Sequence, residues 1–231
     1  MKILAIVPAR YGSKGFPQKN IKTINGKTLI EYAVNVGLDC NLIEDVYISS
    51  DSQKYIDIAK NLGAKSVGIR LEELSDDNSK TVDVVIDLIN NLEKNYDLII
   101  LLQPTSPIRC PQDIENMIKL LINSDAESCV SVCQFEEPHP HKLKGISEDG
   151  FLVPFIDKTT SEVTRQSLPK VYALNGAIYI IRVDVIMNKK TFFPSKTIPY
   201  IMNSNINIDS EKDLIYLKIM NDLNLLSLWD S

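Results

Sequence analysis

Short apolar runs alternate with longer amphipathic stretches through the first half of the chain. Four short runs predict buried strands, at residues 3–7, 45–49, 98–102 and 129–134. Four longer stretches with helical periodicity predict helices, at residues 29–38, 53–62, 81–95 and 111–123. Continuous apolar strands separated by helices are typical of an α/β fold with a mostly parallel sheet that is covered on both faces.

This regular pattern breaks between residues 135 and 169, where prolines, glycines and charges interrupt short apolar segments. The segment is predicted to be an excursion from the sheet and not a separate domain. A further strand is expected at residues 177–181, and a final helix at residues 210–225. We therefore expect one α/β domain over residues 1–231 that carries an irregular excursion at residues 135–169.

Composition and charge exclude several classes of protein. The 231 residues are 44% hydrophobic and 24% charged, which is ordinary for a globular protein with a core. No apolar run approaches the roughly 20 residues of a membrane helix, and the run at residues 3–7 has no cleavage site after it, so a buried strand is expected there instead of a signal peptide. The net charge of −5 argues against a nucleic-acid-binding protein.

The cysteines and histidines do not form a recognisable metal site. The four cysteines include no CxxC pair, and the two histidines, His139 and His141, lie together in one short segment. A zinc site needs a tighter set of ligands. Reduced thiols in a cytoplasmic protein are the expectation.

The loop after the first strand carries the strongest chemical signal. Residues 8–20, PARYGSKGFPQKN, contain two glycines and the cations Arg10, Lys14 and Lys19. Backbone amides and cations of this kind neutralise polyphosphates, and in such sheets ligands bind beyond the carboxyl ends of the strands. A solvated basic loop is the alternative. The Gly-Lys-Thr at residues 26–28 is no P-loop, because Ile21 stands where that motif needs glycine.

Three further segments make the pattern specific: residues 101–109 (LLQPTSPIR), residues 165–169 (RQSLP) with 175–179 (NGAIY), and residues 206–213 (INIDSEKD). Together with residues 8–20 they resemble, in the same order, the motifs of the acylneuraminate cytidylyltransferases, also called CMP-sialic acid synthetases. The motifs spread over nearly the whole chain. The resemblance implies a Rossmann-like nucleotidyltransferase fold.

The resemblance also implies two sets of binding residues. Those expected to bind CTP are Arg10, Ser13, Lys14, Lys19, Asn20, Arg70, Ser79 and Thr81. Those expected to bind the sugar acid are Gln103, Lys142, Arg165, Asn175, Tyr179, Phe192 and Phe193.

The chemistry of several residues in the sugar set agrees with this assignment. The amide of Gln103 suits sugar hydroxyls or an N-acyl group, and the cations Lys142 and Arg165 suit a carboxylate. Simpler interpretations stay open: Lys142 as an exposed loop lysine, and Phe192 with Phe193 as the anchor of a loop to the core. In the family, that aromatic pair contacts the sugar site of a partner subunit.

Asp209 is the candidate ligand for Mg²⁺, which prefers a few carboxylates together with phosphate oxygens and water. The resemblance assigns catalysis to Arg10, Lys19 and Asp209. The family often has a second aspartate where this chain has Asn207, which leaves the number of bound metal ions open. Asp209 could instead cap the following helix, although Ser210 is equally suited to that role.

The implied reaction is the transfer of CMP from CTP to the anomeric hydroxyl of a nonulosonic, sialic-acid-like sugar acid, with release of pyrophosphate. Members of the family are typically homodimers, and residues 135–169 are expected to embrace the neighbouring subunit. A sister enzyme that acts on legionaminate, pseudaminate or 3-deoxy-manno-octulosonate is the nearest alternative. A silent nucleotide-binding protein is a remote one. The motifs contain no histidine, so the general base stays unassigned.

Overall fold

A six-stranded sheet forms the centre of the computed structural model, which describes residues 1–13, 15–135, 137–156, 162, 164–204, 206–226 and 228–229. The strands are β1 (Ile3–Pro8), β4 (Asp45–Ser49), β5 (Leu98–Leu101), β6 (Ser128–Phe135), β9 (Val171–Arg182) and β10 (Thr197–Met202). Their spatial order is β10-β6-β9-β5-β1-β4. All pairings are parallel except the two that β9 makes, with β5 and with β6. The predicted α/β fold with a mostly parallel sheet is confirmed.

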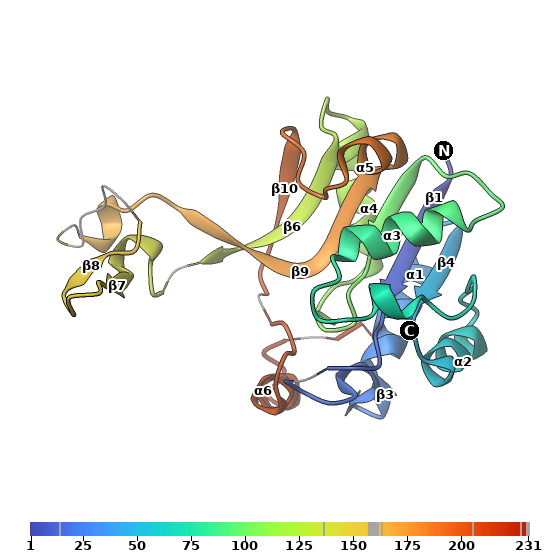
Figure 1. The fold of residues 1–231 in the computed structure, drawn as a ribbon, viewed down its shortest axis with the longest axis horizontal. Helices are drawn as coiled ribbons and strands as arrows, with labels where there is room; N and C mark the ends of the chain where they lie inside the picture. The colour runs from blue at the N-terminus through green and yellow to red at the C-terminus, as the bar shows by residue number, and fades with distance from the viewer. Residues whose placement is uncertain are drawn as a thin grey trace.

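Helices cover both faces of this sheet (Figure 1). They are α1 (Leu29–Leu38), α2 (Gln53–Leu62), α3 (Thr81–Asn90), α4 (Pro111–Ile122) and α5 (Val183–Lys189), with α6 (Glu211–Asp222) beyond the sheet edge. Alternate side chains of β1 serve the two faces, as the pleat of a strand requires. Ile3, Ala5 and Val7 pack in the cluster that includes α1, α2 and α4, whereas Leu4 and Ile6 pack with α3 and α5.

The predicted elements recur with a few different boundaries. The strand at residues 45–49 and the helices at residues 29–38 and 53–62 have the expected ends. Helix α3 ends at Asn90 instead of residue 95, and β9 begins six residues before the expected strand. The patterns did not predict β10, α5 or the small hairpin of β2 (Thr23–Ile24) and β3 (Lys27–Thr28).

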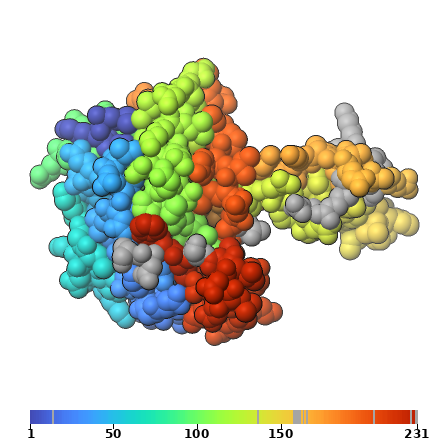
Figure 2. Space-filling model, turned by 180° about the vertical axis from the view of Figure 1, so that it is seen from behind, coloured from blue at the N-terminus to red at the C-terminus, as the bar shows by residue number. Residues whose placement is uncertain are grey.

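Strands β6 and β9 continue past the sheet as a two-stranded ribbon that carries a projecting arm (Figures 1 and 2). The arm contains the hairpin of β7 (Lys144–Ile146) and β8 (Leu152–Pro154) and the short helices η3 (Pro140–Lys142) and η4 (Arg165–Ser167). It occupies the segment that the sequence predicts as an excursion. Several large apolar side chains of the arm are about three-quarters exposed to solvent: Ile146, Phe151, Leu152 and Phe155.

A separate apolar cluster ties the loop after β1 to the last helix. Phe16 from the loop packs with Ile208, Leu214 and Leu217, which lie before and within α6. Their burial holds the two segments together although they come from opposite halves of the sequence. Within the residues that the structure describes, no helix is long and apolar enough to cross a membrane.

Candidate active site

A cleft opens where β1, β4 and β5 end, at the carboxyl edge of the sheet, as expected for a fold of this class. It contains a cavity of about 240 Å³, within which the following predicted residues lie together: Arg10, Lys19, Asn20, Arg70, Ser79, Thr81 and Gln103. An adjoining hollow of about 440 Å³ is lined by Arg10 and Ser13. The structure thus brings the expected CTP residues to one place, apart from Lys14, which lies outside the described residues.

The loop after β1 is held in shape by its own side chains. The amide of Asn20, which is almost fully buried, donates a 3.0 Å hydrogen bond to the carbonyl of Arg10. Phe16 anchors the middle of the loop in the apolar cluster with α6. Gln18 adopts the left-handed backbone conformation, at φ 55°, where the loop turns into the short helix η1 (Lys19–Ile21). The position of Lys19 is therefore fixed by both backbone and packing.

Lys19 reaches across the cleft to the carboxylate before α6. Its Nζ lies 2.7 Å from Oδ1 of Asp209, and its side chain is only 17% exposed, whereas that of Asp209 is 63% exposed. Ser210 caps α6 in a capping box with Asp213, so Asp209 is not the N-cap. The carboxylate of Asp209 is therefore partly exposed beside Lys19, which itself lines the cavity.

The carboxylate of Asp77 pairs with the first arginine of the site. Nη1 of Arg10 lies 2.7 Å from Oδ1 of Asp77, and both side chains are about one-third exposed. Because a triphosphate would need the same guanidinium, Asp77 competes with it for Arg10.

Arg70 sits deeper in the cleft. Its Nε donates to Ser75 Oγ at 3.1 Å, and its guanidinium lies 4.0 Å from the carboxylate of Asp51. Burial lowers the pKa of the Arg70 guanidinium, which the Asp51 carboxylate opposes. The Ser79 hydroxyl is engaged by Glu73 and Asp76, so it faces the cavity from within a fixed turn.

Arg109 organises the loop after β5 from beneath. One of its terminal nitrogens donates to three backbone carbonyls, those of Gln103, Ser106 and Ala177, at 2.8–2.9 Å. The side chain is buried, and burial lowers the pKa of its guanidinium to about 9. Within the described residues no carboxylate pairs with it, which makes it a buried cation next to the cleft.

Gly176 lets β9 approach that loop closely. A Cβ at this position would lie 2.7 Å from Ser106 Oγ and 3.0 Å from Gln103 Oε1, and the residue has φ +73°. Glycine is needed here both for its backbone conformation and for the space. The Gln103 side chain is thus set between the cavity and β9.

The remaining residues expected to bind the sugar acid are dispersed. Asn175 is buried, and its amide is engaged within the chain by Ser131, Ser204 and Ala177, so it belongs to the framework of the site instead of its free surface. Lys142 lies exposed on the arm. The side chain of Arg165 lies outside the described part of the chain.

Three aromatic residues of the sugar set gather on the other side of β9. Tyr179 contacts both Phe192 and Phe193, with ring centroids 5.7 and 6.0 Å apart. Phe192 is buried in the cluster with α3 and α5, which agrees with the simpler interpretation of a core anchor, whereas Phe193 is half exposed. None of the three lines the cavities around Arg10.

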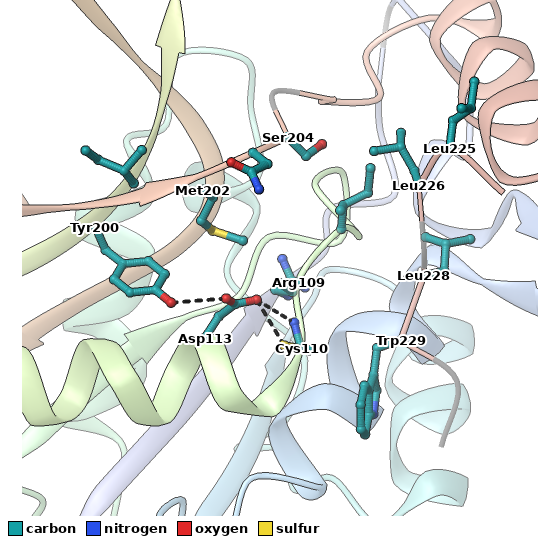
Figure 3. Close-up of a pocket in the computed structure, with 13 residues that line it drawn as sticks. Arg109, Cys110, Asp113, Tyr200, Met202, Ser204, Leu225, Leu226, Leu228 and Trp229 are labelled. Carbon is teal, nitrogen blue, oxygen red and sulfur yellow. Dashed lines mark hydrogen bonds between the residues drawn. The ribbon is translucent and has the colours of Figure 1, made fainter.

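A second cavity, of about 450 Å³, lies on the opposite side of the loop at residues 101–109 (Figure 3). Tyr200 and Met202 face the apolar side chains of Leu226 and Trp229 across it. Asp113 accepts hydrogen bonds there from the Tyr200 hydroxyl at 3.3 Å and from the Cys110 backbone at 2.9 Å. The residues expected to bind CTP do not line this cavity.

Sequence reasoning assigned no role to Asp77, Ser106, Arg109 or Gly176. Ser106, Arg109 and Gly176 lie in the motif segments. The sequence therefore gives their residue types but not their contacts. Asp77 lies in a run of acidic residues, which is typical of a solvated surface. Its ion pair with Arg10 depends on how the turn after η2 (Glu72–Leu74) folds back over the cleft.

The site fits a Mg²⁺ ion that arrives with phosphates. Among the described residues no group of three or more His, Cys, Asp or Glu side chains converges, which argues against a cage made by protein ligands alone. Mg²⁺ is commonly held by one or two carboxylates together with substrate phosphates. Asp209 offers such a carboxylate 2.7 Å from Lys19, which lines the cavity.

Comparison with curated proteins finds several relatives. The chain is 34% identical over 230 residues to the CMP-N,N'-diacetyllegionaminic acid synthase of Legionella pneumophila, covering 97% of this chain and 98% of that protein. It is 31% identical over 221 residues to the N-acylneuraminate cytidylyltransferase of Streptococcus agalactiae, covering 94% of this chain and 52% of that protein. The chain thus spans about half the length of the streptococcal relative.

Two further comparisons concern the fold and the family. The structure superposes on a CMP:2-keto-3-deoxy-manno-octonic acid synthetase solved with CTP, with a TM-score of 0.73, 17% identity and coverage of 97% of this chain and 100% of that one. The profile of the family described as cytidylyltransferase matches residues 4–222. The chain therefore belongs to the cytidylyltransferase family.

Proposed function

We propose that this protein transfers CMP from CTP to the anomeric hydroxyl of a nonulosonic acid and releases pyrophosphate. The observation that carries the proposal is the contact between Lys19 and Asp209 across a cleft lined by Arg10 and Arg70. This arrangement sets cations for a polyphosphate beside a carboxylate for its metal ion. The nonulosonic acids named for the Legionella and Streptococcus relatives support the substrate class.

The chain's own residues would act mainly by position and charge. Arg10 and Lys19 would bind the phosphates and stabilise the negative charge that develops on the departing pyrophosphate. Asp209 would hold the Mg²⁺, which when bound supplies neutralisation of charge at the α-phosphate. Gln103, at the end of β5, would orient the sugar acid so that its hydroxyl oxygen lies in line with the bond that breaks.

The identity of the sugar acid is the open part of the proposal. Sialic, legionaminic and pseudaminic acids share the carboxylate and the anomeric hydroxyl, and relatives of this chain carry the names of all three substrates. The test is pyrophosphate release from CTP with each acid and with 3-deoxy-manno-octulosonate, in the presence of Mg²⁺. Release with one of the nine-carbon acids would support the proposal. CTP binding without release with any acid would favour a silent nucleotide-binding protein.

We also propose that the protein is a homodimer joined through the arm. Four large apolar side chains of the arm, those of Ile146, Phe151, Leu152 and Phe155, are exposed, and exposed apolar surface of this kind is typical of an interface. A second copy of the chain would cover these side chains, and Lys142 and Arg165 lie on the same arm, where they would reach a neighbouring sugar site. Light scattering should give twice the mass of the chain, and Phe151→Ser with Phe155→Ser should give the monomer mass. A wild-type monomer would contradict this arrangement.

A further inference from the structure

Asn207 links two segments of the site. Its Oδ1 accepts a 3.1 Å hydrogen bond from the Ser106 hydroxyl, and its Nδ2 donates to Asp209 Oδ2 at 2.5 Å. The neighbouring backbone is joined in the same place, because the amide of Ile208 donates to the carbonyl of Thr105 at 2.7 Å. Ser106, Asn207 and Asp209 therefore form a continuous relay from the loop after β5 to the carboxylate of the cleft.

The chemistry of the partners fixes the orientation of the Asn207 amide. An ionised carboxylate only accepts hydrogen bonds, so the group facing Asp209 must be the Nδ2 donor. The oxygen of the amide then faces Ser106, whose hydroxyl donates to it. The Asn207 side chain therefore presents its donor, and not its oxygen, to the carboxylate of Asp209.

Asp209 is consequently held at both of its oxygens by the protein. Lys19 binds Oδ1 at 2.7 Å and Asn207 binds Oδ2. An aspartate in place of Asn207 would lack the donor and would set a second negative charge at hydrogen-bonding distance, where like charges repel strongly. A cation between the two carboxylates would then be needed to hold them together.

We propose that Asn207 is a positioning residue, which orients the Asp209 carboxylate through the relay from Ser106. The inference rests on the proposed role of Asp209 at the phosphates. It implies that the carboxylate is ordered before any cation arrives.

Metal binding to the free protein tests this without any turnover. Mn²⁺ would be titrated into wild type, Asn207→Asp and the matched control Asn203→Asp, with bound and free ions separated by electron paramagnetic resonance. Asn203 is exposed and lies nearby. Its replacement by aspartate makes the same change of charge at a position that does not contact Asp209. Asn207→Asp should bind Mn²⁺ at least roughly tenfold more tightly than either, since a second carboxylate joins the first. A gain no larger than that of Asn203→Asp would overturn the proposal, because it would show that the side chain at residue 207 does not face the Asp209 carboxylate.

Steady-state kinetics distinguish a loss of positioning of Asp209 from a general loss of structure. Asn207→Ala should lower kcat by roughly tenfold, the worth of one hydrogen bond to a charged group, and Ser106→Ala should lower it by a smaller factor, since its hydrogen bond is to a neutral amide. The KM for CTP should stay within twofold in both variants. Because both act through Asp209, the double variant should lose no more than the worse single variant. Additive losses, or losses that fall on KM, would refute the relay. If wild type releases no pyrophosphate with any acid, the proposed function fails, whereas the Mn²⁺ titration still decides the role of Asn207.

Discussion

Replacing Gly176 with alanine would test how closely β9 packs against the loop that carries Gln103 and Ser106. The substitution adds one methyl group, 2.7 Å from Ser106 Oγ and 3.0 Å from Gln103 Oε1, at a residue with φ +73°. Gly26 offers a matched control: it has φ +79° in the turn between β2 and β3, and a Cβ there would meet nothing within 4 Å. The two variants therefore share the backbone strain and differ in the contact.

The expected losses of unfolding free energy follow from the backbone strain and from the close contact of the added Cβ. An L-residue in the left-handed region costs about 1–2 kcal/mol, which should be the whole effect of Gly26→Ala. Overpacking adds about 1–3 kcal/mol for Gly176→Ala, giving a total of about 2–5 kcal/mol. Gly176→Ala should also lower kcat, because Ser106 and Gln103 must move, whereas Gly26→Ala should not.

Urea denaturation followed by fluorescence of Trp229 and by circular dichroism would measure both stabilities, and pyrophosphate release would measure kcat. Equal losses of unfolding free energy in the two variants would show that the contact contributes nothing. Wild-type kcat in a stable Gly176→Ala protein would refute the idea that this approach positions the loop.

Two further substitutions probe the cleft, one probes the arm, and a fourth probes the amino end of β4. Asp209→Asn should lower kcat by orders of magnitude with an unchanged melting temperature; near-normal turnover would remove Asp209 from the metal site. Arg165→Ala should raise the KM for the sugar acid much more than that for CTP, and equal effects would show that it does not bind the carboxylate. Asp77→Asn should tighten CTP binding by up to about fivefold in calorimetry, since a partly exposed ion pair with Arg10 is worth about 0.2–1 kcal/mol; weaker binding would mean that Asp77 helps to hold the nucleotide. Burial opposes ionisation of Asp45, but hydrogen bonds from two lysines and a tyrosine outweigh it and hold its pKa at about 2, so Asp45→Asn should lose about 2 kcal/mol of unfolding free energy at pH 7. That difference should vanish as pH falls from about 4 to below 2, and a gap that persists in acid would contradict the assignment.

Elements with a clear hydrophobic period were predictable, and elements set by tertiary contacts were not. Helix α1 and helix α2 carry an apolar face that ends at a recognisable position, and their bounds were predicted without error. β10 contains Pro199 and lies at the sheet edge with alternating exposure, so its sequence shows no continuous apolar run. The antiparallel direction of β9 depends on the ribbon that it forms with β6, which no local pattern encodes.

The candidate site also has features that the local sequence predicted and features that depend on tertiary contacts. The chemistry of the loop after β1, with two glycines and the cations Arg10, Lys14 and Lys19, predicted a polyphosphate site. The ion pair of Lys19 with Asp209 spans 190 residues of sequence. The family resemblance assigned both residues to the site, but their direct contact was not predicted, because spacing carries no information at that range. The roles of Arg109 and Asn207 depend on which backbone carbonyls and side chains surround them. Such contacts are properties of the folded chain.

The packing of Phe16 against the last helix has a consequence for the synthesis of the protein. Since the cationic loop emerges early during synthesis and its carboxylate partner some 190 residues later, the nascent polypeptide spends most of its translation without the ion pair between Lys19 and Asp209. A ribosome stalled before Asp209 would leave a fragment that has the phosphate loop yet cannot complete the cleft. Supplying the missing segment in trans would be a direct way to restore it.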